Sequence, residues 1–517
     1  MQNCESEIQC FDMNFIFVQN SEVLSTYKRL AGDTAIYGIS SILGRVLNWL
    51  LTPYYTRVFL ESEFGVQTNL YSYAAILLVI LTYGMETSFF RFASKSENPG
   101  RVYSTSLISV FSTSLLFLLI FILLKNPIAG FIQYPQHPEY IVWFAAILAI
   151  DAVTAIPFAW IRIEKKAVKF AAIKLINIAF NIGFNLFFIT FCPWILKHNP
   201  ESWIRFIYSP EIGVGYIFIS NLLASGIMLL MLLPDILKIK FQFDKEIFKK
   251  LLNYGLPILI VGIAGQLTLY VGNILIPFLI PESQEPMKQL GIYGANLKLA
   301  VLMNMFIQAF RFAFEPFFFA RGNSQDDPVI YANIMKYFVI FGLLIFLGMT
   351  LYIDLLQFIN DQKYNSGLKV LPIILMANLI YGMYYTQSLW YKITDKTRYG
   401  ATQSDIASVV SITLNFLLIP VFGYMGSAFT LLFSYVFVLV ISYFQGEKYY
   451  PVPYNLKRIG IYFTVALSLF FISGLFQSFN PFVKAGLGTL LIFVFFGVVY
   501  AFEKKDLKGL FKMNKKK

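Results

Sequence analysis

The chain has 517 residues, of which 57% are hydrophobic and 14% are charged. Soluble proteins carry about 25% charged residues, so this composition excludes an ordinary soluble, disordered or fibrous protein. The formal net charge is +12, and in a membrane protein the excess of Lys and Arg is expected on cytoplasmic loops. The sequence therefore predicts an all-α polytopic membrane protein, and no nucleic-acid partner is needed to explain the charge.

The chain shows no motif for a metal or a nucleotide. Its three cysteines and two histidines form no CxxC and no spaced ligand set, so we expect no metal and no cofactor. There is no GxxxxGK[ST] motif, which argues against direct use of ATP.

Residues 1–29 carry four acidic residues and lack the pattern of a signal peptide. We expect a cytoplasmic tail there, with either Met1 or Met13 as its start. A bilayer core takes about 20 apolar residues per helix, and fourteen stretches of this length follow. They lie at about 31–59, 66–91, 103–124, 140–161, 170–191, 213–234, 251–280, 290–315, 330–353, 368–391, 402–420, 425–444, 458–476 and 482–502.

The distribution of basic residues supports this count. With the N-terminus inside, 29 of the 41 Lys and Arg fall on the inner segments and 8 on the outer loops. This bias predicts that both termini are cytoplasmic and that Cys192 lies near the outer face. A plasma (bacterial inner) membrane location is expected.

A weak internal repeat relates the second and eighth helices: Gly65 matches Gly291, and Glu86 matches Glu315. It predicts two lobes of six helices, at 30–240 and 241–446. Residues 447–517 would add two further helices and a basic tail. The glycines and prolines between 251 and 280 predict that the seventh helix is bent and mobile.

Two arginines lie within predicted spans, where a cation needs an anion or water. At 100° per residue, Arg45 shares a polar stripe with Asn48 on the first helix. The eighth helix places a longer stripe around Arg311. Its other members are Tyr293, Asn296, Asn304, Gln308 and Glu315.

Other polar residues in the spans leave two interpretations open. Asn181 lies on a stripe of the fifth helix, and such residues also serve as hydrogen bonds between helices. Glu86 and Glu315 lie within a turn or two of Arg91 and Arg311. They are either static ion pairs or groups that couple transport to protons.

The stretch GRVLNWLLTPYYTRVFLESEFGVQTNLYSYAAILLVILTYGMETSFFRF (44–92) resembles the polysaccharide transporters. These are the O-antigen and lipid-linked oligosaccharide flippases of the MOP superfamily. The segments YGMETSFFRF (83–92) and AFRFAFEPFFF (309–319) carry the likeness.

The resemblance implies a V-shaped pair of six-helix lobes with two extra C-terminal helices. In such proteins helices 1, 2, 7 and 8 line a central cavity, and cations there hold the pyrophosphate of the substrate. Arg45 and Arg311 stand where this pattern would want them. The implied function is translocation of an undecaprenyl-pyrophosphate-linked oligosaccharide by alternating access, for cell-surface polysaccharide or lipopolysaccharide biosynthesis.

Three alternatives stay open. A cation-coupled multidrug exporter of the same superfamily would need acidic groups, for which Glu86, Asp151 and Asp405 are candidates. A lipid II flippase is less favoured because few arginines lie in the predicted spans. A membrane glycosyltransferase or polymerase would need catalytic groups on a large outer loop, so we expect that the protein is not an enzyme. The coupling ion, proton or sodium, is left open.

Overall fold

The computed structural model describes residue 38 and residues 42–238, 240–321, 327–476 and 478–514, except for the side chains of 313, 315–327 and 505–514. These residues form helices and turns and contain no strand. Among them, 12 helices are long and apolar enough to cross a membrane, and a bent pair of helices is a thirteenth candidate. The first predicted span is helical over 42–58, and its start lies outside the described residues. The all-helical membrane fold predicted from the sequence is therefore confirmed.

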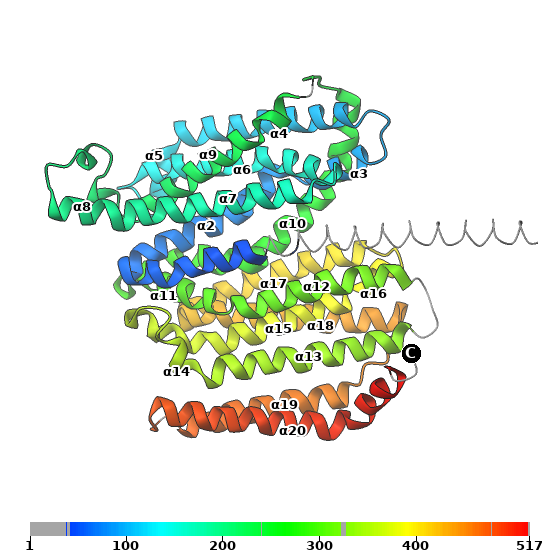
Figure 1. The fold of residues 1–517 in the computed structure, drawn as a ribbon. Coiled ribbons are helices and arrows are strands. Elements are labelled where there is room, and N and C mark those ends of the chain that lie inside the picture. The colour runs from blue at the N-terminus through cyan, green and yellow to red at the C-terminus, as the bar shows by residue number, and fades with distance from the viewer. Residues whose placement is uncertain (1–37, 39–41, 239, 322–326, 477, 515–517) are drawn as a thin grey trace, which may run out of the picture.

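Figure 1 shows the helices in two stacked groups with a helix pair below them. The N-terminal lobe contains the helix over 42–58, α2 (Glu61–Thr82), α3 (Met85–Ala93), α4 (Pro99–Leu123), α5 (Lys125–Phe131), α6 (Pro138–Ile163), α7 (Ala167–Leu186), α8 (Cys192–His198) and α9 (Gly215–Leu237).

The C-terminal lobe contains α10 (Lys245–Leu279), α11 (Pro286–Leu299), α12 (Val301–Arg321), α13 (Asp327–Leu351), α14 (Ile353–Leu356), α15 (Leu371–Gln387), α16 (Leu389–Ile393), α17 (Arg398–Phe422) and α18 (Tyr424–Tyr449). The extra pair is α19 (Leu456–Ser473) and α20 (Pro481–Asn514), which packs on α13. We call the end of the molecule at which α8 lies the α8 face, and the opposite end, at which α20 ends, the α20 face (Figure 1). The predicted lobe boundary at 240 falls between α9 and α10, whereas the one at 446 falls in the last turn of α18. Both stay proposed domain limits.

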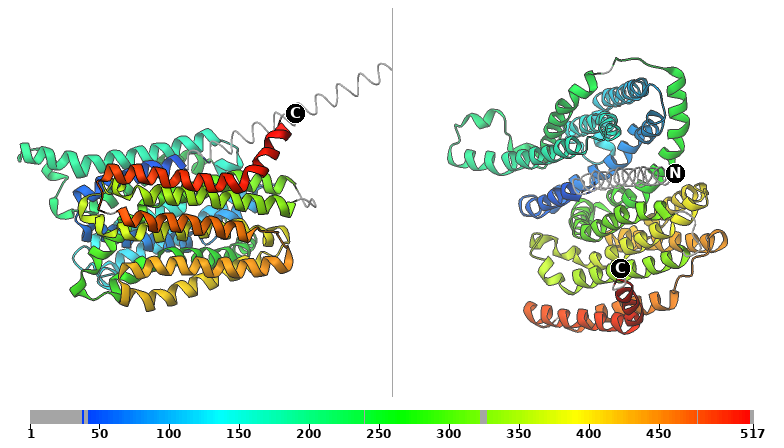
Figure 2. Two further views of the ribbon diagram at one scale, coloured as in Figure 1. Left: turned by 90° about the horizontal axis from the view of Figure 1, so that it is seen from below. Right: turned by 45° about the vertical axis from the view of Figure 1, so that its right-hand side comes forward.

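The seventh span is continuous, and its predicted bend and mobility stay predictions. α10 is one helix of 35 residues despite Pro257 and Pro277. Its first half packs on α2 and α3 of the N-terminal lobe, and its second half contacts α2, through Asn273, as well as α17 and α18. Figure 2 shows it descending from one lobe toward the other. α10 therefore links the two lobes along most of its length.

The connection before α10 is fastened to the N-terminal lobe. Asp244 caps α10 by accepting from the backbone N–H groups of Glu246 and Ile247, and it pairs with Arg101 of α4 at 3.0 Å. The hydrogen bond from Ile247 is the main cause that lowers the pKa of Asp244, so the cap is ionised at neutral pH. The start of α10 is thus held at the α20 face by the N-terminal lobe.

The eighth span is bent, whereas the predicted polar stripe treats it as one continuous helix. α11 and α12 meet at an angle of 43° around Ala300. No Gly or Pro occurs between residues 298 and 302, so the bend comes from packing. α11 is held against α2 and against the turn at Gln362–Val370, while α12 packs on α13 and α15.

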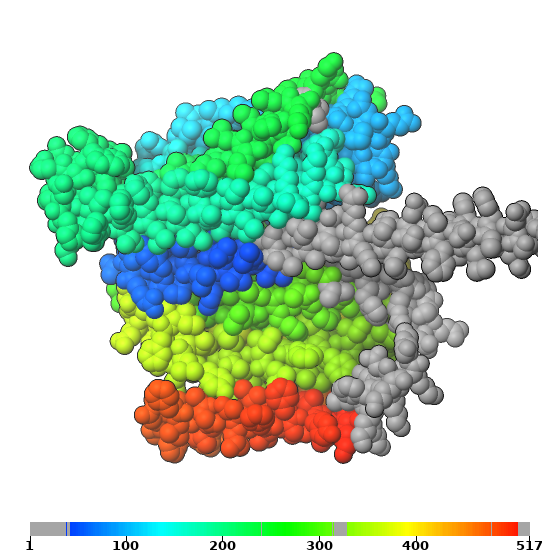
Figure 3. All heavy atoms as spheres, in the orientation of Figure 1, coloured from blue at the N-terminus to red at the C-terminus, as the bar shows by residue number. Residues whose placement is uncertain are grey.

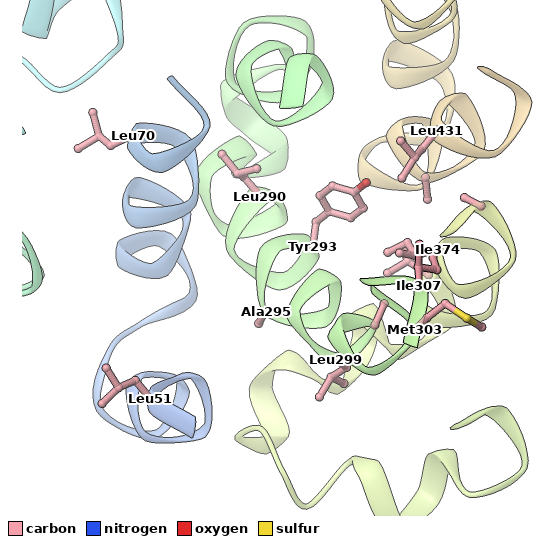
Figure 4. Packing of buried hydrophobic residues seen from close by; sticks show 14 of the residues in the cluster. Leu51, Leu70, Leu290, Tyr293, Ala295, Leu299, Met303, Ile307, Ile374 and Leu431 are labelled. Carbon is pink, nitrogen blue, oxygen red and sulfur yellow. The ribbon is translucent and has the colours of Figure 1, made fainter. Parts of the chain in front are cut away.

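The core of the C-terminal lobe gathers between α11, α12, α15 and α18. Figure 4 shows Tyr293, Ile307, Ile374 and Leu431 pointing into one region, where all four are at most 6% exposed. Leu51 lies apart from this group, on the first helix. This packing fixes α12 as a rigid carrier for the polar residues on its other face.

The extra helix pair is tied to the lobe by a buried carboxylate. Glu503 of α20 is fully buried and accepts from Lys336 of α13 at 2.6 Å, from Arg458 of α19 at 3.2 Å and from Tyr462 at 2.5 Å. Hydropathy and helical periodicity do not mark Lys336 and Glu503 as partners. Their pairing needs two helices that are more than 160 residues apart in the chain to meet.

We expect Glu503→Ala to lower the free energy of unfolding by about 3–5 kcal/mol, because it leaves the buried Lys336 without this carboxylate. Thermal unfolding of the purified protein in detergent measures the change as a lower midpoint. The double variant Lys336→Met with Glu503→Leu should recover much of the loss, since Arg458 is one-third exposed and can reach water. A single variant as stable as the parent would contradict this role.

Candidate functional site

The two arginines predicted for an anion site come together between the lobes. Arg45 lies on the helix over 42–58, and its charge interacts with Arg311 of α12 and with Tyr270 of α10. Figure 3 shows the first helix, in blue, between α7 of the N-terminal lobe and the helices of the C-terminal lobe. Residues more than 260 positions apart thus share one electrostatic environment.

Neither arginine is neutralised in the described part of the chain. The guanidinium of Arg311 lies over the ring of Tyr385, 4.0 Å from its centroid, and no described carboxylate lies within ion-pair distance of Arg45 or Arg311. Arg45 is exposed and Arg311 partly exposed. Two cations that repel each other and have no acidic partner among the described side chains are suited to bind an anion.

The amides on α12 follow the same face as Arg311. Asn304, Gln308 and Arg311 are spaced by four and three residues, which places them on one side of the helix. Asn304 and Gln308 are both partly exposed, and Asn48 on the first helix is exposed. These residues are available as hydrogen-bond donors and acceptors on the helices that carry the two arginines.

Because of the bend at Ala300, the N-terminal part of the predicted stripe, on α11, does not continue the polar face of α12. Tyr293 and Asn296 are buried in α11. The amide of Asn296 donates to the carbonyl of Tyr364 at 3.0 Å. The continuous stripe from 293 to 315 is therefore wrong, because α11 turns its polar groups toward the C-terminal lobe.

Asn181 bonds to Asn185 of its own helix, and Asn185 makes the contact with the first helix. Its side-chain oxygen accepts from Asn185 at 3.0 Å, and Asn185 accepts from the hydroxyl of Tyr55 on the first helix at 2.8 Å. The bond from Tyr55 joins α7 to the first helix. The structure records no contact between Asn181 and Arg45 or Arg311 within the part it describes, so a direct role in binding stays a prediction.

Glu86 of α3 pairs with a residue from another helix. Its carboxylate accepts from Arg162 at the end of α6, whereas Arg91 lies over the ring of Tyr254, 4.3 Å from its centroid. The expected pairing of Glu86 with Arg91 is therefore wrong. The cause is the packing of α3 against α6 and α10. The side chain of Glu315 lies outside the described residues.

The lobes are locked together at the α8 face. Arg57 donates to the carbonyl of Phe358 at 3.2 Å, Thr56 accepts from the backbone N–H of Asp361 at 3.3 Å, and Tyr364 donates to the carbonyl of Phe59 at 3.2 Å. We call these contacts the α8-face lock. Sequence reasoning missed them because they join the end of the first helix to a loop of the other lobe.

Two glycines allow α2 and α11 to approach each other closely beside the α8-face lock. A Cβ on Gly65 of α2 would lie 2.0 Å from the carbonyl oxygen of Met287, and one on Gly291 of α11 would lie 1.7 Å from that of Glu61. Side chains larger than hydrogen are therefore excluded from this contact. Gly65 and Gly291 are the residues that the internal repeat relates, and they meet across the lobe interface.

A model of the family described as polysaccharide biosynthesis protein matches residues 30–321, more than half of the chain. The chain belongs to this family. The match runs from before the first described helix to the end of α12, so it includes both arginines. No curated protein matches the chain.

Solved structures share the fold. The lipid II flippase MurJ, in an inward closed conformation, is 14% identical with a TM-score of 0.68, covering 90% of this chain and 98% of that one. An inward-facing multidrug resistance MATE family transporter of the MOP superfamily is 12% identical with a TM-score of 0.62, covering 80% and 94%. The MATE multidrug transporter DinF-BH is 16% identical with a TM-score of 0.57, covering 82% and 96%. The chain is therefore a member of the polysaccharide biosynthesis protein family with the fold of MurJ and of the MATE transporters of the MOP superfamily.

Proposed function

We propose that the protein is a flippase that moves an undecaprenyl-pyrophosphate-linked oligosaccharide across the inner membrane, for the synthesis of a cell-surface polysaccharide such as O-antigen. The observation that carries the proposal is the arginine pair, Arg45 and Arg311, without a described carboxylate partner. Guanidinium groups bind phosphate oxygens in a forked geometry. Asn48, Asn304 and Gln308 supply neighbouring polar groups for the pyrophosphate or the first sugars.

The α8-face lock supports one state of an alternating-access cycle. In the proposed cycle the α8-face lock closes one side, and the cargo approaches the exposed Arg45 from the α20 face or from the lipid side. MurJ and the MATE transporter of similar fold are described as inward closed and inward-facing. In the proposed cycle the cargo binds in this state, the lock opens, and the glycan leaves toward the α8 face.

The orientation follows from the basic residues, which gather on the segments at the α20 face. That face is cytoplasmic in our proposal. Cys192 is fully buried at the start of α8, so it is a poor reporter, and exposed positions are needed.

In a variant that keeps Cys192 and lacks Cys4 and Cys10, we expect His198→Cys to react with an impermeant thiol reagent in spheroplasts. His198 is exposed at the α8 face. Thr397→Cys, exposed before α17 near the α20 face, should react only after the membrane is permeabilised. The reverse pattern would overturn the orientation.

The alternatives find less support. The drug-transporting relatives show the fold only. Glu86 is paired with Arg162, and Asp151 accepts from Ser225 at 3.0 Å beside Lys174. No described acidic group adjoins the arginine pair to bind a cationic drug. Coupling to protons through Glu86 and Glu315 stays a proposal, as does the choice between proton and sodium.

Deleting the gene and analysing the lipid-linked glycans tests the proposed function. We expect one undecaprenyl-pyrophosphate glycan to accumulate on the cytoplasmic side and the corresponding surface polysaccharide to disappear. Accumulation of lipid II alone would favour a lipid II flippase. Unchanged glycans with increased drug sensitivity would favour an exporter.

A further inference from the structure

A third cation adjoins the arginine pair on the side of the α20 face. Lys392 lies in α16, the short helix that follows α15. Its ammonium group is 4.9 Å from the ring centroid of Tyr385. The guanidinium of Arg311 lies 4.0 Å from the centroid of the same ring. Tyr385 therefore contacts both cations.

The shared ring sets the spacing of the two charges. Since their distances to one centroid are 4.0 and 4.9 Å, the charges are less than about 9 Å apart. Like charges at this separation repel each other, although the ring face offsets part of the cost. An anion with two charged groups would bridge them better than an anion with one.

The three cations also form a series. Lys392 stands near the α20 face, Arg311 shares its ring contact with Lys392, and Arg45 interacts with Arg311. A pyrophosphate that enters from the α20 face meets them in this order. In this scheme the pyrophosphate contacts the next cation before it leaves the previous one. Its negative charge is therefore compensated along the whole path.

We propose that Lys392 is a pyrophosphate-binding residue at the entrance, which receives the head group and passes it to Arg311, with Tyr385 holding the two cations at the required spacing. This proposal rests on the proposed flippase function and adds to it a residue and a selectivity for diphosphate over monophosphate. Tyr385 acts as a positioning residue in this scheme.

The chain offers a matched control. Lys396, four residues after Lys392, lies over the ring of Tyr449, 3.4 Å from its centroid. Tyr449 stacks on Trp390 and hydrogen-bonds to Tyr399, and the structure shows no described contact between it and Arg311. Lys396 thus has the same charge and the same kind of aromatic contact, without the link to the arginine pair.

The test measures binding of farnesyl pyrophosphate and farnesyl monophosphate to the full-length protein in detergent by calorimetry. We expect Lys392→Gln to lower the affinity for the pyrophosphate about tenfold, which corresponds to the loss of one charge-assisted contact. The affinity for the monophosphate should fall by less than about threefold. Lys392→Arg should keep most of the affinity, and Lys396→Gln should change neither. Tyr385→Leu should reduce the preference for pyrophosphate, whereas Tyr385→Phe should retain it.

The outcomes separate the two proposals. Equal effects of Lys392→Gln and Lys396→Gln, or equal losses for both ligands, would overturn the role of Lys392. If Arg311→Gln weakens the binding of pyrophosphate while Lys392→Gln does not, Lys392 is not an entrance residue. The proposed flippase site at Arg311 is then still supported. If the parent does not bind farnesyl pyrophosphate, or Arg311→Gln binds it as the parent does, the proposed site itself falls.

Discussion

Replacing Arg311 by alanine should abolish export of the lipid-linked glycan, and Arg45→Ala should do the same. Each substitution would remove charge-assisted hydrogen bonds to phosphate, worth about 1.5–3 kcal/mol apiece. The affinity for the substrate would fall about ten- to hundredfold for each contact that is lost. Neither side chain is needed to neutralise a described carboxylate, so the fold should persist. Complementation of a deletion strain, read as surface polysaccharide, measures the effect.

Three controls define this result. Arg205→Gln removes an exposed arginine near the α8 face that pairs with Glu201, and it should complement fully. Arg311→Lys should restore part of the activity, because it keeps the charge and loses the forked geometry. The amount of each variant in the membrane must match the parent. Normal complementation by both alanine variants would show that the arginine pair is not the anion site.

Gly291→Val should also abolish transport, for a mechanical reason. Its Cβ would overlap the carbonyl oxygen of Glu61, which an added Cβ would approach to 1.7 Å, so α2 and α11 cannot meet. The lobes would then stay apart at the α8 face. Thr56→Cys reports this state, because Thr56 is fully buried in the closed lock. We expect the thiol to be protected in the parent background and reactive in the Gly291→Val background.

Gly226→Ala is the matched control for this experiment. Gly226 also lies in a membrane-spanning helix, but an added Cβ would meet nothing within 4 Å. It should leave transport and the protection of Thr56→Cys unchanged. A transport-competent Gly291→Val variant with a protected thiol would contradict the role of the lock.

The sequence was sufficient for the fold because each span carries its own signal. Hydropathy and the loop charges predict the fourteen spans, and thirteen of them are found complete among the described residues when the bent pair counts as one. The repeat also pointed to Gly65 and Gly291, although not to their mutual contact. The bend at Ala300 could not be predicted, since no helix breaker marks it and the packing of α11 on α2 imposes it.

The candidate site was only partly predictable. Helical periodicity identified Arg45 and Arg311 because cations are rare within spans. It could not find Tyr270 and Tyr385, since tyrosines are common throughout this chain. It also assigned Glu86 to the nearby Arg91, whereas tertiary packing brings Arg162 to it. Ion pairs between helices depend on which faces meet, and a single sequence does not contain that information.

The most direct test of the central claim is transport in proteoliposomes. Purified protein is inserted into vesicles loaded with a fluorescent glycan on an undecaprenyl-pyrophosphate carrier, and the appearance of the glycan on the opposite leaflet is followed with an impermeant quencher. We expect the parent to move the lipid faster than protein-free vesicles, and the Arg45→Ala, Arg311→Ala double variant to match the protein-free rate. Equal rates for the parent and the double variant would contradict the account.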